Sequence, residues 1–226
     1  MKERPILFSG AMVRALLDGS KTQTRRIVKP QPREDRSHDH VKEHESIFTW
    51  WAGNLTLGVQ HEARCPYGQP GDRLWVRETW LEDPDDDGTW AYTQYTGCKG
   101  SPLSDIPRKF QKPEHCIFRE GWDGSSLRWR PSIHMPRWAS RILLEIVSVR
   151  VERLQDISEA DCWAEGIEAV DGALDDLAII HLAKRMGRSF EDAAPTYAAL
   201  WESINGAGSW DANPWVWVIE FKRVTR

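Results

Sequence analysis

Gly19-Ser20-Lys21-Thr22-Gln23-Thr24-Arg25-Arg26 marks a corner between a predicted helix and a predicted strand. The amphipathic run at residues 12–17 precedes it, with Ser9 as a candidate N-cap and Gly19 where a helix end favours a left-handed residue. The β-branched, partly alternating residues that follow predict a strand over 22–28. An amine and a hydroxyl at such a corner can bind an anion or form an activated nucleophile. An ordinary solvated strand is the alternative interpretation.

The bulk composition limits the class of protein. The chain has 226 residues and a formal net charge of -4, which allows one large domain or two small ones. Because proteins that bind long tracts of nucleic acid are usually basic, this charge disfavours such binding. The sequence has no apolar run of about eighteen residues, and its first apolar run is too short for a signal peptide. We therefore expect a cytoplasmic protein without membrane contact.

The cysteines give no strong metal signal. The chain has four of them, scattered without a Cys-x-x-Cys pair, which argues against a disulfide framework and a zinc ribbon. A site built from Cys65, Cys98 and Cys116 is conceivable, although isolated thiols are the favoured interpretation. We expect no metal and no cofactor.

The order of the expected elements indicates an α+β fold. Strands are expected at 5–8, 73–80, 141–151 and 215–221, and the last is apolar on both phases, as in a central strand. A phase change near Ile146 and Val147 predicts a bulge, which suits a small, curved barrel. Helices are expected at 159–165, 174–186 and 195–204. The prediction is one domain, 1–226, built on a mixed β-barrel with flanking helices.

Two insertions interrupt this pattern. The first spans about 30–65, and its polar residues 30–46 predict an exposed loop. The second spans about 83–135, is rich in Gly, Pro, Asp and aromatic residues, and is expected to hold a few short strands. The chain has 13 tryptophans, and some of those near this insertion, such as Trp138, could stack on bases. Glu78 ends an apolar row, so it is either a functional carboxylate or the partner of a nearby arginine.

Four motifs in order resemble the ASCH family, a branch of the PUA-like superfamily of small β-barrels. The motifs are Gly19-Ser20-Lys21-Thr22-Gln23-Thr24-Arg25-Arg26, Gly71-Asp72-Arg73-Leu74-Trp75-Val76, Ile157-Ser158-Glu159-Ala160-Asp161 up to Glu165-Gly166, and Trp217-Val218-Ile219-Glu220-Phe221-Lys222. The fragment Trp138-Ala139-Ser140-Arg141-Ile142 is similar to a phage and prophage subgroup. The insertions at 30–65 and 83–135 depart from the smallest active members of the family.

This resemblance implies a function. Some ASCH proteins are amidohydrolases that remove the acyl group from N4-acetylcytidine, and the matching residues here are Lys21, Thr24 and Glu165. Other members are RNA-binding modules, and some are ribonucleases. The expected partner is thus a nucleoside, a modified base or single-stranded RNA. The residues expected to bind it are Arg25, Arg26, Glu78, Arg137 and Trp138.

The implied chemistry sets two conditions on the structure. Lys21 must be neutral to take the proton of Thr24, so its pKa must fall about three units from ~10.4, which is roughly 4 kcal/mol. Strict strand alternation would put Lys21 and Thr24 on opposite faces, so Lys21 must lie in the turn outside the strand. Two hypotheses remain open: an N4-acylcytidine amidohydrolase, and a non-catalytic module that binds RNA or a modified base. A metal-independent ribonuclease is a third.

Overall fold

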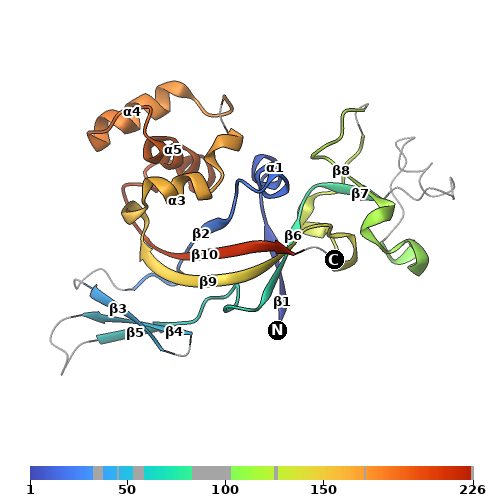
Figure 1. The fold of residues 1–226 in the computed structure, drawn as a ribbon, viewed down its shortest axis with the longest axis horizontal. Helices are drawn as coiled ribbons and strands as arrows, with labels where there is room; N and C mark the ends of the chain where they lie inside the picture. Colours follow the sequence, from blue (N-terminus) through green and yellow to red (C-terminus); the bar gives the residue numbers. More distant parts are fainter. Residues whose placement is uncertain are drawn as a thin grey trace.

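The main sheet of the computed structural model is mixed and has five strands in the order β1-β6-β9-β10-β2 (Figure 1). The structure describes residues 1–32, 38–44, 46–52, 59–82, 103–124, 127–170 and 172–224. Strand β1 runs parallel to β6, and the other neighbours are antiparallel. The strands are β1 (Glu3–Leu7), β2 (Gln23–Ile27), β6 (Arg73–Arg77), β9 (Leu143–Arg153) and β10 (Trp215–Val224).

The long pair β9 and β10 curves through the centre of the molecule (Figure 1). Its register passes from Glu220 opposite Ser148 to Phe221 opposite Ile146, so Val147 bulges out of the ladder. The bulge predicted near Ile146 and Val147 is therefore confirmed, and the apolar β10 is central as expected. A bulge increases local twist and bends the bulged strand.

The sheet is curved but open. Its two edge strands, β1 and β2, are joined by a side chain, because Nη2 of Arg26 donates to the Leu7 carbonyl at 2.7 Å. No backbone ladder joins β1 to β2, and none of the sheets that the structure describes closes on itself. The fold is α+β as expected, whereas the expected closed barrel is not confirmed.

Helices and a second sheet bury the two faces of β10. Val216 and Val218 pack into a core with helix residues such as Tyr197, and the alternate residue Trp217 packs into a second core with Phe48 and Trp50. Helices α3, α4 and α5 gather on one side of β9 and β10 in Figure 1. The helices are α1 (Gly10–Asp18), α3 (Glu159–Ala164), α4 (Asp176–Met186) and α5 (Ala193–Asn205). Each of the expected helical segments, at 12–17, 159–165, 174–186 and 195–204, overlaps one of them and differs at its ends by no more than a few residues.

The first insertion forms a small sheet where we expected an exposed loop. Strands β3 (His38–His44), β4 (Ile47–Ala52) and β5 (Val59–Ala63) pair in that order, so the loop prediction for 30–46 is wrong over 38–44. The reason lies in β4, where Phe48 and Trp50 alternate into the core. Their rings meet Trp217 edge-on at 5.1 and 6.2 Å, which anchors the sheet on β10.

The second insertion holds short elements around a small core. Strand β8 (Cys116–Phe118) pairs with β7 (Trp80–Glu82), and Trp80, Phe118, Met135 and Ala139 form a buried cluster there. Residues 83–102 lie outside the described part of the chain. Single 3-10 turns complete the fold: η1 (Leu103–Asp105), η2 (Arg108–Phe110), η3 (Pro113–His115), η4 (Ser132–His134), η5 (Arg137–Ala139), η6 (Leu154–Asp156) and η7 (Ile167–Val170). Within the described residues, no helix has the length and apolar character needed to cross a membrane.

Candidate functional site

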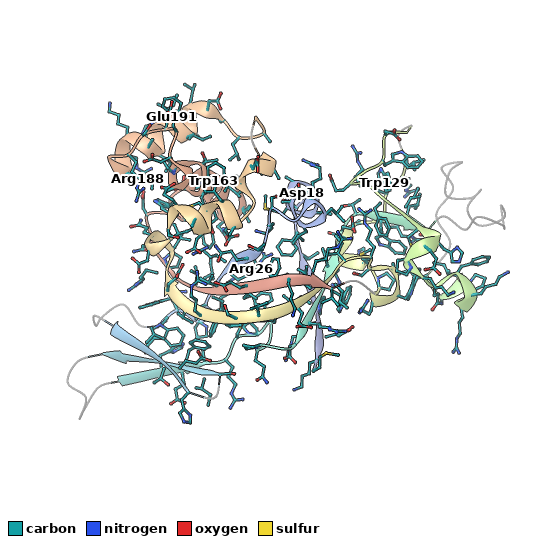
Figure 2. All side chains as sticks on the ribbon, viewed as in Figure 1. Asp18, Arg26, Trp129, Trp163, Arg188 and Glu191 are labelled. Atoms are coloured by element: carbon teal, nitrogen blue, oxygen red, sulfur yellow. The ribbon has the colours of Figure 1, made fainter. Side chains whose placement is uncertain are left out.

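A cavity of about 570 Å³ opens where α1, the edge strand β2, the C-terminal end of α3 and helix α5 meet. Lys21, Thr24 and Glu165 all contribute to its lining, together with Arg25 and Arg26. In Figure 2, Arg26 lies between α1 and the group formed by α3, α4 and α5. The apolar part of the wall comes from Phe8, Met12, Leu200, Trp201 and Ile204, among others. The three residues expected to be catalytic therefore share one concave surface.

The corner that carries Lys21 is held from both sides by backbone hydrogen bonds. Helix α1 ends at Gly19 in the left-handed region with φ 89°, as the sequence predicted. The amide of Lys21 donates to the Ala15 carbonyl at 3.0 Å, and that of Thr22 donates to the Ala164 carbonyl at 2.9 Å. Strand β2 begins only at Gln23, so Lys21 lies outside the pleat. Strand alternation therefore does not prevent Lys21 and Thr24 from facing the same site.

Gly166 allows α3 to approach this corner closely. Its φ is +79°, and a Cβ added there would lie 2.9 Å from the Cβ of Ala15 and 3.0 Å from the Cβ of Lys21. A side chain at position 166 would therefore be strained in its backbone and would push against the residue that presents the amine.

Replacing Gly166 with alanine is expected to lower the free energy of unfolding by about 2–3 kcal/mol, because it adds a steric clash to the backbone strain. The matched control is Gly187→Ala at the C-terminus of α4, where φ is 65° and the space around the added Cβ is open. Gly187→Ala should lower the free energy of unfolding only by the backbone strain, about 1 kcal/mol. Urea denaturation of both variants measures the difference, and equal losses would contradict the close-approach argument.

Glu165 reaches Lys21 from the end of α3. Ser158 caps the start of this helix by accepting a hydrogen bond from the amide of Asp161 at 3.1 Å, as its sequence pattern predicted. At the other end, Nζ of Lys21 donates to the Glu165 carbonyl at 2.6 Å and to its Oε2 at 2.9 Å. A carboxylate at a helix C-terminus is unfavourable for the helix dipole, so these contacts offset a local cost.

Arg25 compensates the negative charge of Glu165. Its guanidinium is fully buried and contacts three carboxylates, with Nη1 at 3.2 Å from Glu165 Oε1 and Nη2 at 3.1 Å from Asp161 Oδ2. Its Nε lies 3.0 Å from Oε1 of Glu152. The Glu165 carboxylate therefore bridges the Lys21 amine and the Arg25 guanidinium, and Arg25 supplies its permanent counter-charge.

The surroundings of Lys21 shift its amine toward the neutral form. Burial lowers the pKa of Lys21 below its ordinary 10.5; the nearby Glu165 carboxylate opposes this shift, and the charges of Arg25 and Arg26 add to it. Only 4% of the residue is exposed. The direction is the one that a general base near neutral pH requires.

Thr24 and Tyr197 are two of the hydroxyl-bearing residues that line the cavity. Neither hydroxyl has a hydrogen-bond partner among the described residues. Burial, and then the charge of Glu165, raise the pKa of the Tyr197 phenol well above its ordinary value, so Tyr197 stays a donor. Lys29, which belongs to the basic cluster of Lys21, Arg25 and Arg26 in the sequence, also lines the cavity, whereas Tyr197 is a site residue that the sequence patterns did not single out. Nothing in the pattern of α5 marked Tyr197 as different from an ordinary core aromatic residue.

The other residues expected to bind substrate lie elsewhere. Glu78 is 2% exposed and pairs with Arg141 through two hydrogen bonds of 2.9 and 2.8 Å, which is the alternative the sequence left open. Burial raises the pKa of the Glu78 carboxyl, and Arg141 opposes that shift. Arg137 pairs with Glu3 at 2.6 Å. The ring of Trp138 packs edge-on against Trp80 at 5.4 Å. None of Glu78, Arg137 and Trp138 lines the cavity.

The thiols supply no metal site in the described part of the chain. Cys65, Cys116 and Cys162 form no disulfide bond with one another, and no group of His, Cys, Asp and Glu side chains there is arranged to hold an ion. Cys98, the third member of the conceivable site, lies outside the described residues. Burial raises the pKa of Cys65 to about 11 and that of Cys162 to about 12, so both stay protonated near neutral pH.

Comparison with known proteins returned no matching family model, no matching curated protein and no matching solved structure.

Proposed function

We propose that the protein removes an acyl group from the N4 amide of a cytosine nucleoside, with Thr24 as the nucleophile and Lys21 as the base. One observation carries the proposal: Lys21 and Thr24 from the corner before β2 and Glu165 from the end of α3 line a single cavity, with Lys21 Nζ 2.9 Å from Glu165 Oε2. The ASCH resemblance, which rests on the motifs alone, names the same three residues.

The contacts of Lys21 suit a neutral amine. Such an amine has two hydrogens and one lone pair, and Glu165 accepts two hydrogen bonds from Nζ, at its carbonyl and at Oε2. With both hydrogens engaged, the lone pair is left to accept the proton of Thr24. Glu165 then orients the base and takes no proton itself, and Arg25 keeps its carboxylate compensated.

The reaction proceeds by acyl transfer in two halves. Oγ1 of Thr24 attacks the acyl carbon while Lys21 accepts the hydroxyl proton, which gives a tetrahedral oxyanion. Tyr197, a neutral donor in the same cavity, donates to this oxyanion. The C–N4 bond then breaks, and the proton on Lys21 passes to N4, which releases cytidine. Water then attacks the acyl-Thr24 ester with Lys21 again as the base. The C–Oγ1 bond breaks and Lys21 returns the proton to Oγ1, which releases a carboxylic acid and regenerates Thr24.

The direct test is to incubate the purified protein with N4-acetylcytidine and to follow the release of cytidine and acetate by chromatography. We expect turnover by the native protein and none above background by Lys21→Ala. Circular dichroism of the variant checks that its fold is retained. An absence of cytidine at high protein concentration would reject the proposed function.

The pH profile should report the ionisation of Lys21. Because the neutral amine is the active form, kcat/KM is expected to rise with pH through the Lys21 pKa, with a midpoint below 10.5. Since the Glu165 charge raises that pKa, Glu165→Gln should move the midpoint further down while it lowers the rate. Kinetics from about pH 6 to about pH 10 measure both, and a Glu165→Gln midpoint above the native one would contradict the assignment.

The second candidate function is a module that binds its ligand without catalysis. The buried ion pair between Lys21 and Glu165 favours this candidate. A charged Lys21 that stays paired with Glu165 would fix a ligand and could not accept a proton. In that case Thr24→Val would bind cytidine as the native protein does, and neither protein would release cytidine from the acetylated nucleoside.

A further inference from the structure

The cationic residues of the cavity fall into two groups. Lys21 and Arg25 are buried and both contact the Glu165 carboxylate, and Glu152 and Asp161 add to the compensation of Arg25. Arg26 and Lys29 also line the cavity, but neither forms an ion pair with a residue that the structure describes. The cavity wall therefore carries two uncompensated positive charges.

Arg26 is held in place before any ligand arrives. Its Nη2 donates to the Leu7 carbonyl at 2.7 Å, and its guanidinium lies over the ring of Phe8 with 5.2 Å between Cζ and the ring centroid. These contacts use one edge of the group and leave its charge unneutralised. Lys29 is exposed and stands three residues further along the chain. A fixed guanidinium and an ammonium on a flexible stem, both in the lining of one cavity, are a combination suited to a phosphate.

We propose that the ligand of this cavity is a nucleoside monophosphate and that Arg26 and Lys29 bind its phosphate. The volume of about 570 Å³ lies within the range of roughly 300–1,000 Å³ that is typical of small-molecule sites. The net charge of -4 argues against a long polyanion as the ligand. The inference rests on the proposed function for the identity of the base, which is cytosine. It extends that function because the substrate becomes an N4-acylated cytidine nucleotide.

The phosphate contact can be tested by binding alone, without turnover. Isothermal titration calorimetry at low salt compares cytidine with cytidine 5′-monophosphate on the native protein. We expect the nucleotide to bind at least about tenfold more tightly and to lose this advantage as salt is added. In Lys29→Met the advantage should fall to about threefold or less, and in Arg26→Gln likewise.

Two matched controls separate this contact from general charge effects. Lys2→Met removes another exposed lysine, and Arg223→Gln removes an exposed arginine that also donates to a main-chain carbonyl, that of Leu17 at 3.2 Å. Neither residue lines the cavity, so the nucleotide advantage should persist in both. An equal loss of the nucleotide advantage in the two controls would show that the effect is not local. It would overturn the assignment of Arg26 and Lys29 to the phosphate.

The remaining outcomes are equally decisive. Affinities of cytidine and its monophosphate within twofold of each other on the native protein would overturn the inference, even if N4-acetylcytidine is hydrolysed. If a cytidine-containing trinucleotide binds more tightly than the mononucleotide, the inference is overturned and the ligand is a nucleic-acid strand. A nucleotide advantage that depends on Arg26 and Lys29 would support it even if no deacylation occurs, and only the proposed function would then fail.

Discussion

Thr24→Val is expected to abolish deacylation of N4-acetylcytidine while the protein stays folded. Loss of the attacking oxygen removes the covalent route, and such losses lower kcat by about 10⁴-fold or more. Valine has nearly the shape of threonine, and the Thr24 hydroxyl has no hydrogen-bond partner among the described residues. The free energy of unfolding should therefore change by no more than about 1 kcal/mol.

Thr22→Val is the matched control for this prediction. Thr22 is exposed, and its hydrogen bonds at the corner run through its backbone, to the Ala164 carbonyl and from the Phe221 amide, so valine preserves them. Thr22 does not line the cavity. The same hydroxyl-to-methyl change two residues away should thus leave kcat within about twofold of the native value. Retention of turnover within tenfold in Thr24→Val would show that another group is the nucleophile.

The local elements of the fold were predictable because their signals are local. Gly19 and Ser158 mark the ends of helices through backbone geometry and capping, and both do so in the structure. The change of apolar phase at Val147 gave the bulge directly. Closure of the sheet into a barrel could not be predicted from the sequence. Whether the edge strands β1 and β2 pair depends on distances that the curvature of the whole sheet sets. In the described part of the chain, the side chain of Arg26 spans the two edges through its hydrogen bond to the Leu7 carbonyl.

The small sheet in the first insertion shows a different limit. Its first strand is polar, so alternation gave no sign of it, and its stability depends on rings of β4 that meet a tryptophan from the far end of the chain. Contacts between segments so distant in sequence leave no local pattern. The aromatic pair Phe48 and Trp50, two residues apart, was the signal available in the sequence.

The site residues likewise divide into those that a local sequence pattern predicts and those that it does not. Lys21, Thr24, Arg25 and Arg26 fall in one short motif, so their presence in one cavity follows from one corner of the chain. Glu165 comes from a distant helix, and only the family resemblance singled it out. For Glu78 an apolar row and a carboxylate suggested a site, but such a pattern also describes a buried ion pair, and the structure shows that pair with Arg141. Sequence spacing cannot separate the two cases, because the partner is 63 residues away.

Arg25→Met is expected to destabilise the protein by about 3–5 kcal/mol, because it removes a buried counter-charge from the buried Glu165 carboxylate and from the half-buried Glu152 and Asp161. The Arg25 side chain is 0% exposed and contacts Glu152, Asp161 and Glu165, which are 18%, 24% and 5% exposed. Urea denaturation followed by tryptophan fluorescence measures the loss. Arg188→Met is the control, since Arg188 pairs with Glu159 at 2.8 Å on the surface and should contribute no more than about 1 kcal/mol (Figure 2).

The pH dependence of this loss distinguishes uncompensated charge from lost packing. In the native protein, burial alone would raise the pKa of Asp161, but the hydrogen bond from Gln23 and the charge of Arg25 lower it below 3.8. A carboxyl with a lowered pKa stabilises the fold above its ordinary pKa, and this contribution disappears as the pH falls through the folded-state value. The gap between native protein and Arg25→Met should therefore be widest near neutral pH and should narrow below about pH 4. A gap that stays constant with pH would assign the loss to packing, and Arg25 would then not be the counter-charge that lets Glu165 hold Lys21 as a base.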